Sequence, residues 1–517
     1  MDTRSSTSVA EPGPSELSFD SKQLLFSTQP SGSSSAVRRL SAEGAVERKK
    51  TSILQRAVTL LQPEREMGPP PTTWQSIRAI ITASYLNVLL LCIPISWALN
   101  FTLPNEYTLI FVFSFLAIIP LAKLLAFATE ELSLRVGQTL AGLMNATLGN
   151  AVELIVSIIA LVKCELDIVQ SSLIGSILSN LLLVLGMCFF AGGLRFSEQG
   201  FGMVSAQTNS SLLTISVIAV LIPSAFVSSL GSSTDITTID SLVLKMSHGV
   251  AIILLLIYMS YLVFQLFSHK SLYTDDNKEI QQTKQYTDNP FKLKKFRRGK
   301  QATVPQYAET PLVTSPGTSP QPQAHTVVPG IGMGDAAGPE SGRMSPTPGE
   351  EEIEEPQLSV AVSLGLLVGV TVLVAVTAEF LVGSINGLAA SGKIGKEFIG
   401  VILLPIVGNA AEHLTAVTVS VKDKLTLSLG VAVGSSIQVA LFIIPFIVIL
   451  GWILGKPLTL LFDPLQSIVL FLSVLTVNYT VQDGKSNWLE GMILICLYLI
   501  VAVTFWFYPG ATPLLTC

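Results

Sequence analysis

Eleven long apolar segments dominate this sequence, and they limit the folds that the chain can adopt. At 1.5 Å per residue, each is long enough as a helix to cross a hydrocarbon layer of about 30 Å. Because a backbone in lipid must satisfy its own hydrogen bonds, the segments predict helices. We expect an all-α polytopic membrane protein with about 11 transmembrane helices. The segments lie near residues 80–100, 107–128, 138–162, 169–191, 210–231, 241–267, 359–384, 398–421, 426–454, 465–482 and 488–508.

Charged residues lie mostly outside these segments. Residues 1–78 and 268–356 together hold 20 of the 31 Lys and Arg and 20 of the 36 Asp and Glu. Their composition predicts a disordered N-terminal tail and a largely disordered linker. Between and after them lie a first membrane half, 79–267, a second half, 357–508, and a short C-terminus, 509–517. The basic residues of the tail and linker place both on the cytosolic side, and an odd number of crossings places the C-terminus opposite, facing the lumen or the exterior.

A short motif occurs once in each half. Residues 149–153 read Gly-Asn-Ala-Val-Glu, and residues 408–413 read Gly-Asn-Ala-Ala-Glu-His. The same offset aligns Lys163 with Lys422 after the two motifs. Because an odd number of crossings separates the copies, they run in opposite directions, as in the inverted repeats of alternating-access carriers. We therefore expect two inverted repeats of five helices plus one extra N-terminal helix.

Glu153 and Glu412 lie deep inside apolar segments. Each stands about ten residues before a helix-ending lysine, roughly 15 Å along a helix, which predicts a position near the membrane midplane. A carboxylate there is costly, so we interpret the pair as ion or proton ligands, with a buried structural ion pair as the alternative. The helices are expected to loosen at the glycine before each asparagine and at Pro405, where backbone carbonyls become free to bind a cation.

Oxygen donors on the following segments complete a predicted cation site. Carboxylate, hydroxyl, amide and carbonyl oxygens suit Ca²⁺ or Mn²⁺, whereas soft metals would want thiolates and several histidines. Close helix packing is an equally good interpretation of the serines and of the glycines beside them, Gly175 and Gly434. The donors are Ser172, Ser176, Ser179, Asn180, Ser435, Ser436 and Gln438.

The pair of acids also predicts proton coupling. Two facing midplane carboxylates cannot both be ionised and empty in a low dielectric, so protons or a divalent cation must neutralise them. A carrier that crosses between its states only when neutralised exchanges the cation for protons, with at least about two protons per cation as a hypothesis. His413, beside Glu412, is interpreted as a proton shuttle or as a packing residue.

Further acids flank this site. Glu130 and Glu131 end the second segment on the cytosolic side, and Glu379 lies near the opposite end of the seventh. We interpret them as vestibule acids or as ordinary interfacial glutamates. An acidic run in the linker is interpreted as a collector of cations at the cytosolic mouth or as a solvated charge run. It consists of Glu350, Glu351, Glu352, Glu354 and Glu355.

Taken together, these features resemble the cation/proton exchanger family of the calcium/cation antiporter superfamily, most of all the vacuolar Ca²⁺/H⁺ exchangers of fungi. The resemblance rests on the two motifs, the Gly-Ser helices after them, the segments 128–130 and 377–379, and the acidic run. It implies an eleven-helix carrier in the vacuolar membrane that uses the proton gradient to load Ca²⁺, often Mn²⁺ as well. By position, Glu153 and Glu412 match the central cation ligands, and Asn150 and Asn409 match their motif partners.

Several other functions fit the sequence less well. A sodium-driven calcium exchanger of the same superfamily would want more acids in the repeat helices, and a cation channel would favour rotational symmetry. An intramembrane hydrolase is disfavoured because His413 lacks a second histidine four residues away. We expect no enzyme activity, no cofactor besides Ca²⁺ as transported substrate, and no nucleic-acid partner. A homo-oligomer in the bilayer is left open.

Overall fold

The computed structural model of this chain describes residues 68–230, 236–273, 280–287, 356–392 and 394–510. These residues form the membrane region and the short segments attached to it. The predicted acidic run, most of the N-terminal tail and most of the linker lie outside them.

The first half is a series of helices joined by short loops. Its elements are α3 (Thr73–Thr82), η1 (Tyr85–Leu91), α4 (Cys92–Thr102), α5 (Tyr107–Ser133), α6 (Gln138–Leu148), α7 (Ala151–Val162), α8 (Leu166–Leu178), η2 (Ser179–Val184), α9 (Leu185–Gly193), β1 (Phe196–Gly200), α10 (Met203–Leu230) and α11 (Ile236–Val263). The end of α11 and the start of the linker contain η3 (Phe264–Ser268), η4 (Lys270–Tyr273) and β2 (Lys284–Gln285).

The second half has the same character. Its elements are α12 (Val360–Ala390), α13 (Lys396–Phe398), η5 (Ile399–Leu403), α14 (Leu404–Gly408), α15 (Ala410–Val421), α16 (Leu425–Gln438), η6 (Val439–Ile443), α17 (Ile444–Ile453), α18 (Pro464–Thr480), β3 (Lys485–Ser486) and α19 (Trp488–Phe507).

Long apolar helices dominate the described residues, as the sequence predicts. Eight of them are long and apolar enough to cross a membrane, and the bent pair Lys396–Gly408 and Ala410–Val421 makes a ninth. The helices α7 and α18 are apolar but shorter. The membrane-spanning helical fold is thereby confirmed, while the count of eleven crossings and the inverted repeat stay predictions.

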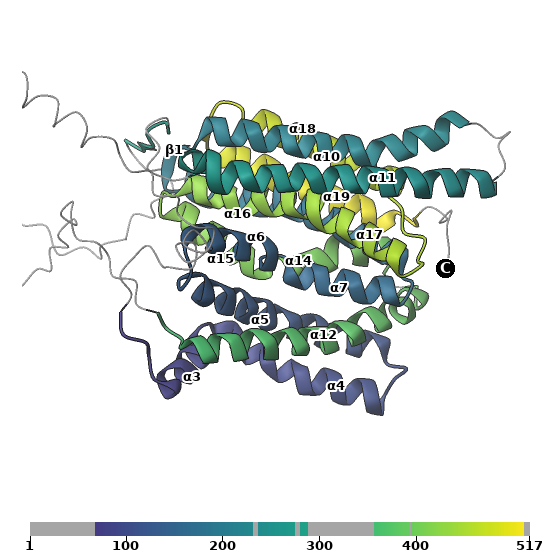
Figure 1. Ribbon diagram of the computed structural model, residues 1–517, viewed down its shortest axis with the longest axis horizontal. Coiled ribbons are helices and arrows are strands. Elements are labelled where there is room, and N and C mark those ends of the chain that lie inside the picture. Colours follow the sequence, from purple (N-terminus) through teal and green to yellow (C-terminus); the bar gives the residue numbers. More distant parts are fainter. Residues whose placement is uncertain (1–67, 231–235, 274–279, 288–355, 393, 511–517) are drawn as a thin grey trace, which may run out of the picture. The chain divides into compact units, whose positions relative to one another are not determined.

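Helices of the two halves pack against one another in pairs. The helix α12 lies along α5, α19 along α9, α18 along α10, and α17 along α11 (Figure 1). The segment from η5 to α14 packs against α8. Because each half is covered by the other, the buried core runs continuously through both.

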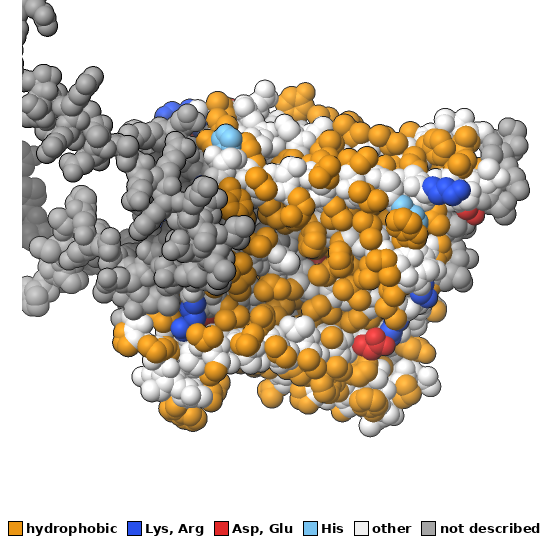
Figure 2. Space-filling model, in the orientation of Figure 1, with side chains coloured by type: hydrophobic (Ala, Val, Ile, Leu, Met, Phe, Trp, Pro, Cys, Tyr) orange, Lys and Arg blue, Asp and Glu red, His pale blue; other side chains and the backbone are white. Residues whose placement is uncertain are grey.

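The outer surface of the helices is apolar. Exposed side chains include Val88 on η1, Leu256 on α11 and Ile500 on α19. Figure 2 shows hydrophobic side chains covering the middle of the visible face, with the charged side chains mostly toward the two ends. Such a band is expected of helices that contact lipid.

A small sheet is an addition that the all-α prediction did not include. The strand β1 lies between β2 and β3 and pairs with each in antiparallel register. Glu198 of β1 forms ion pairs with Lys284 at 2.7 Å and with Lys485 at 3.6 Å. Part of the linker is therefore ordered, because it adds a strand to the loop between α9 and α10. We call the end of the helices that carries this sheet the linker side.

The predicted boundary of the disordered tail is also wrong. Residues 73–78 begin α3, whose first turn is fixed by a capping box between Thr72 and Gln75. Ser76 in this turn is buried, and its hydroxyl accepts the backbone N–H of Ser359 at 3.0 Å. This hydrogen bond holds α3 against the start of α12.

Candidate functional site

Both copies of the repeated motif lie at a break in a helix. In the first half, Gly149 and Asn150 separate α6 from α7. In the second half, Asn409 separates α14 from α15, and the two parts meet at 58°. The predicted loosening is thereby confirmed at the two motifs, whereas Pro405 lies inside α14, and the binding of a cation by freed carbonyls stays a prediction. Each break leaves carbonyls of one helix end and N–H groups of the next helix without helical partners, so polar backbone gathers at both motifs.

A π-helical segment follows each helix of predicted donors. The segment η2 begins at Ser179 after α8, and η6 begins directly after Gln438 of α16. π-Helical turns are rare and are frequently found at functional sites. Both halves thus depart from regular helix at the motif and again beside the predicted donors.

The two motif asparagines form reciprocal contacts across the halves. The hydroxyl of Ser435 donates to Asn150 Oδ1 at 2.8 Å, and Asn150 Nδ2 donates to Gln438 Oε1 at 2.9 Å. In the other direction, Asn409 Nδ2 donates to Ser176 Oγ at 3.2 Å. Both asparagines are buried. The structure therefore brings together four of the predicted ligands, Asn150, Asn409, Ser176 and Ser435.

Glu153 and Glu412 each lie in the first turn of the helix that follows a break. Glu153 Oε1 and Glu412 Oε2 are buried and have no hydrogen-bond partner within the described parts of the chain. The Glu153 carboxylate lies against Gly408, just before Glu412. Gly408 stands four residues before Glu412, about one helical turn, so the two acids lie on segments that touch. The pair is thus placed together, with oxygens available for another ligand.

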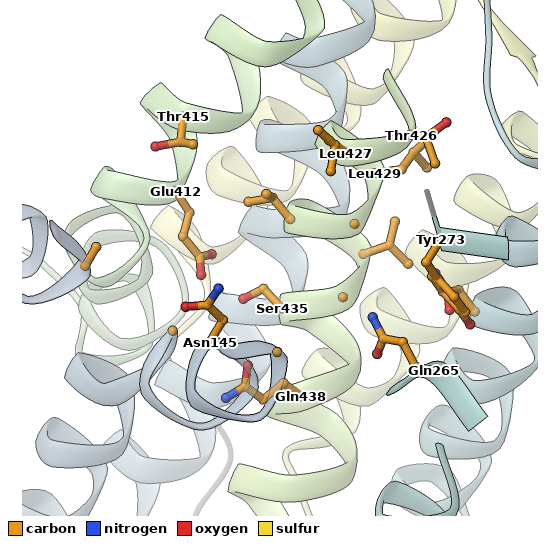
Figure 3. A pocket seen from close by; sticks show the side chains of 18 of the residues that line it. Asn145, Gln265, Tyr273, Glu412, Thr415, Thr426, Leu427, Leu429, Ser435 and Gln438 are labelled. Atoms are coloured by element: carbon orange, nitrogen blue, oxygen red, sulfur yellow. The ribbon is translucent and has the colours of Figure 1, made fainter. Parts of the chain in front are cut away.

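A cavity of about 530 Å³ reaches Glu412 from the linker side. Near its mouth it is lined by Gly202, Gln265 and Tyr273, which lie beside the small sheet and the linker. At its inner end Glu412 points toward Asn145 and Ser435 (Figure 3). Glu153 instead lines a separate space of only about 20 Å³. Glu412 therefore lines the large cavity that opens on the linker side, whereas Glu153 lines only the small space.

His413 and the outer acids lie outside the inner site. His413 Nε2 lies 3.4 Å from Ser179 Oγ and does not line the large cavity. Glu130 is exposed and lines that cavity, as a vestibule acid would. Glu379 lies at the opposite ends of the helices, where its carboxylate pairs with Lys163 at 2.9 Å.

Glu131 is placed away from the predicted vestibule. It is buried and does not line the large cavity. Its carboxylate accepts the backbone N–H of Gln357 at 3.0 Å and that of Leu358 at 3.0 Å. These contacts hold the end of the linker against α5, so this position indicates a structural role.

A cation between the two central acids would need mixed oxygen ligands. Among the described residues, no three His, Cys, Asp or Glu side chains are close enough to hold one metal ion. Two carboxylates would therefore be joined by serine, amide, backbone carbonyl or water oxygens, which is the ligand chemistry of Ca²⁺ rather than of a soft metal.

Comparison with known proteins identifies the family. Residues 106–267 and 362–507 match the family described as sodium/calcium exchanger protein. The chain belongs to this family. A vacuolar calcium ion transporter of Cryptococcus neoformans var. grubii is 50% identical over 98% of this chain and 89% of that protein. A Ca²⁺/H⁺ antiporter of Synechocystis is 37% identical over 82% of this chain and 97% of that protein.

Solved structures agree with this membership in the exchanger family. The Ca²⁺/H⁺ antiporter protein YfkE has a TM-score of 0.57 and 28% sequence identity, and the match covers 82% of this chain and 99% of that chain. A structure described as the H⁺/Ca²⁺ exchanger CAX has a TM-score of 0.52 at 11% identity, covering 85% and 94%, and shares the fold. The resemblance on which the sequence interpretation rests is confirmed.

Sequence reasoning missed several residues that line the large cavity. Asn145 lies one helical turn before Gly149 and points into the cavity (Figure 3). The motif offset aligns it with Leu404, so the repeat gave no signal for it. Tyr258, Tyr261 and Tyr273 line the cavity from α11 and η4. A polar amide inside an apolar segment was the signal that could have indicated Asn145.

Proposed function

We propose that this chain exchanges Ca²⁺ for protons across the vacuolar membrane, with Glu153 and Glu412 as the groups that bind either ion. The observation that carries the proposal is the pair itself. Both acids lie at helix breaks, and each keeps a buried oxygen that has no partner in the described structure. The names of the relatives, vacuolar calcium ion transporter and Ca²⁺/H⁺ antiporter, support the choice of ions and membrane.

The surrounding donors support a hard divalent cation. Asn150 with Ser435 and Asn409 with Ser176 bring amide and hydroxyl oxygens beside the two acids. Ca²⁺ accepts six to eight such oxygens at flexible geometry, and waters in the cavity can complete its shell. The same oxygen set suits Mn²⁺, which we include as a second substrate.

The closeness of the two acids supplies the coupling. In a low dielectric, two neighbouring carboxylates without a cation must hold protons, because their charges repel and burial disfavours ionisation. When Ca²⁺ binds, each carboxylate gives up its proton and the site stays close to neutral. Protons and Ca²⁺ therefore compete for the same atoms, and each is carried only when the other has left.

The two glycines after the motifs support alternating access. A Cβ at Gly175 would overlap the carbonyl oxygen of Val401, so α8 is packed tightly on η5. A Cβ at Gly434, which the motif offset aligns with Gly175, would meet nothing within 4 Å, because Gly434 faces the large cavity. If the halves are inverted repeats, this difference is what a carrier open on the linker side would have, and the opposite state would close at Gly434 and open at Gly175.

The orientation follows from the same arrangement. We infer eleven crossings, with α6 and α7 forming one and α18 another, so that the linker and the N-terminus share the cytosolic side. The large cavity then opens to the cytosol, and Glu379 faces the lumen. Glu130 is retained as a cytosolic vestibule acid, Glu379 as its lumenal counterpart, and His413 as a proton-coupling residue next to Glu412.

Proteoliposomes with an acidic interior test this proposal. Ca²⁺ added outside should enter, and a protonophore that dissipates the pH gradient should stop it. Glu153→Gln and Glu412→Gln should each abolish uptake, while Glu106→Gln, which changes an exposed acid at the start of α5, should not. Uptake with either central glutamine would overturn the assignment.

The same vesicles separate proton coupling from sodium coupling, which the name of the family makes the natural rival. An outward Na⁺ gradient at equal pH on both sides should not drive Ca²⁺ entry. If it does so as well as a pH gradient, the proposal of proton exchange fails.

A further inference from the structure

The two central acids have different surroundings, although the repeat places them at equivalent positions. Glu412 lines the large cavity of about 530 Å³, and Glu153 lines the small space of about 20 Å³. The motif offset aligns several residues that line the cavity with residues that line the small space. Equivalent positions therefore show how the approach to Glu412 differs from the approach to Glu153.

Asn145 marks the clearest difference. It lies in the last turn of α6, is exposed, and points toward Glu412 in the cavity (Figure 3). Its counterpart by the motif offset is Leu404, the first residue of α14, which is buried and lines the small space with Glu153. An amide thus lines the approach to one acid at the position where a leucine lines the space beside the other.

A second pair of positions differs in the same direction. Thr415, one helical turn after Glu412, lines the cavity, whereas its counterpart Val156 lines the small space. The small space has hydroxyls of its own, on Ser157 and Ser172, but no amide side chain among the described residues that line it. The amide is therefore a feature of the linker-side approach.

The Asn145 side chain is available to bind an ion. No hydrogen bond joins it to another residue of the described ranges. Amide carbonyl oxygens are ordinary Ca²⁺ ligands, as carboxylates and waters are, whereas a leucine offers no ligand atom. A Ca²⁺ ion that approaches Glu412 must exchange some of its waters for protein oxygens, and Asn145 supplies one on that route. Leu404 supplies none, so an ion on the opposite route keeps more of its waters.

We propose that Asn145 is a one-sided Ca²⁺ ligand, which binds the ion as it passes between the linker-side cavity and Glu412. This role rests on the proposed exchange of Ca²⁺ for protons. It makes the apparent affinity for Ca²⁺ higher on the linker side than on the opposite side, where Leu404 occupies the equivalent position. The ion gradients still set the direction of net exchange, so the asymmetry changes only the concentrations at which each side saturates.

Transport measurements on each side of the membrane test this role. The full chain, with an affinity tag inserted in the linker, is reconstituted at low density into vesicles with an acidic interior. Vesicles that a tag-binding resin captures carry the linker side outward, and active vesicles that it does not capture carry the linker side inward. Ca²⁺ entry then gives the KM on each side, and we expect the lower KM in the captured vesicles.

Substitutions at Asn145 should act on one side only. Asn145→Leu should raise the KM of the captured vesicles by about tenfold, the lower end of the loss in affinity when a metal site loses a supporting residue. Asn145→Asp should lower the KM of the captured vesicles, because added carboxylate charge strengthens Ca²⁺ binding. Both variants should leave the KM of the uncaptured vesicles and the melting temperature unchanged, because the side chain is exposed. Gln207→Leu, at an exposed amide on α10 outside the cavity, is the matched control and should change neither KM.

Two results would overturn the one-sided role. One is an equal change of KM in both vesicle populations, which would indicate a general effect on the site. The other is an unchanged KM in the captured vesicles for both Asn145→Leu and Asn145→Asp. If the native chain showed no Ca²⁺/H⁺ exchange in these vesicles, the proposed function itself would fail, so the two failures are distinguishable.

Discussion

Gly408 gives the sharpest structural prediction about the central pair. A Cβ added at this glycine would lie 2.5 Å from Glu153 Oε1 and 3.1 Å from its Cδ. Ordinary contacts of this kind begin at 3.4 Å, so Gly408→Ala must push the carboxylate away by about 0.9 Å. A displacement of about 1 Å at a reacting group can cost about 100-fold in rate. We therefore expect Gly408→Ala to lower Ca²⁺ uptake by roughly this factor.

The same substitution should not harm the fold. Gly408 is the last residue of α14, and alanine is about 1 kcal/mol better than glycine in a helix. The melting temperature should therefore stay the same or rise while uptake into proteoliposomes falls. Gly249→Ala is the matched control, because its Cβ would meet nothing within 4 Å on α11. Normal uptake by Gly408→Ala would refute the close packing of Glu153 on the second motif.

Three further outcomes are expected. Asn150→Ala leaves the buried side chains of Ser435 and Gln438 without this partner, so the free energy of unfolding should fall by about 1–3 kcal/mol. An unchanged thermal melting curve would contradict the hydrogen bonds between Asn150 and Ser435. Glu131→Gln weakens the charge-assisted hydrogen bonds to the end of the linker and should lower stability by about 1–2 kcal/mol, while Ca²⁺/H⁺ exchange persists. A loss of exchange at normal stability would instead support the predicted role of Glu131 as a vestibule acid. Lys284 holds the pKa of Glu198 below its ordinary value of 4.5. The stability that this ion pair gives to the sheet is therefore fully present above pH 4.5 and is lost as the pH falls through the lowered pKa. The protection factors of the β2 amides, which correct for the pH dependence of intrinsic hydrogen exchange, should stay constant from about pH 7 to 5 and fall only in stronger acid. A loss of protection already at about pH 6 would contradict the ion pair.

The apolar segments predicted the helices well because span length and hydropathy are local properties. The helix breaks at Gly149 and Asn409 were also predictable, since glycine and asparagine beside a buried acid are poor at continuing an apolar helix. The swapped pairing of Asn150 with Ser435 and of Asn409 with Ser176 is a tertiary fact. The sequence indicated these residues but not their partners.

Other features depend on how the two halves pack in the folded chain. Glu153 and Glu412 occupy equivalent places in the sequence, yet Glu412 lines a large cavity and Glu153 only a small space. A repeat pattern cannot predict this difference, because it arises from packing between segments that are far apart in the sequence. The strand β2 was missed for a similar reason, since its order comes from pairing with β1 and not from its own composition.

Proton release on Ca²⁺ binding measures the central claim most directly. Purified protein in a weakly buffered solution, with a pH indicator, should release one proton from each of Glu153 and Glu412 when Ca²⁺ binds. Glu153→Gln or Glu412→Gln should remove its share of that release and weaken Ca²⁺ binding. Tight Ca²⁺ binding by the native chain with no proton release would contradict the exchange of Ca²⁺ for protons at this pair.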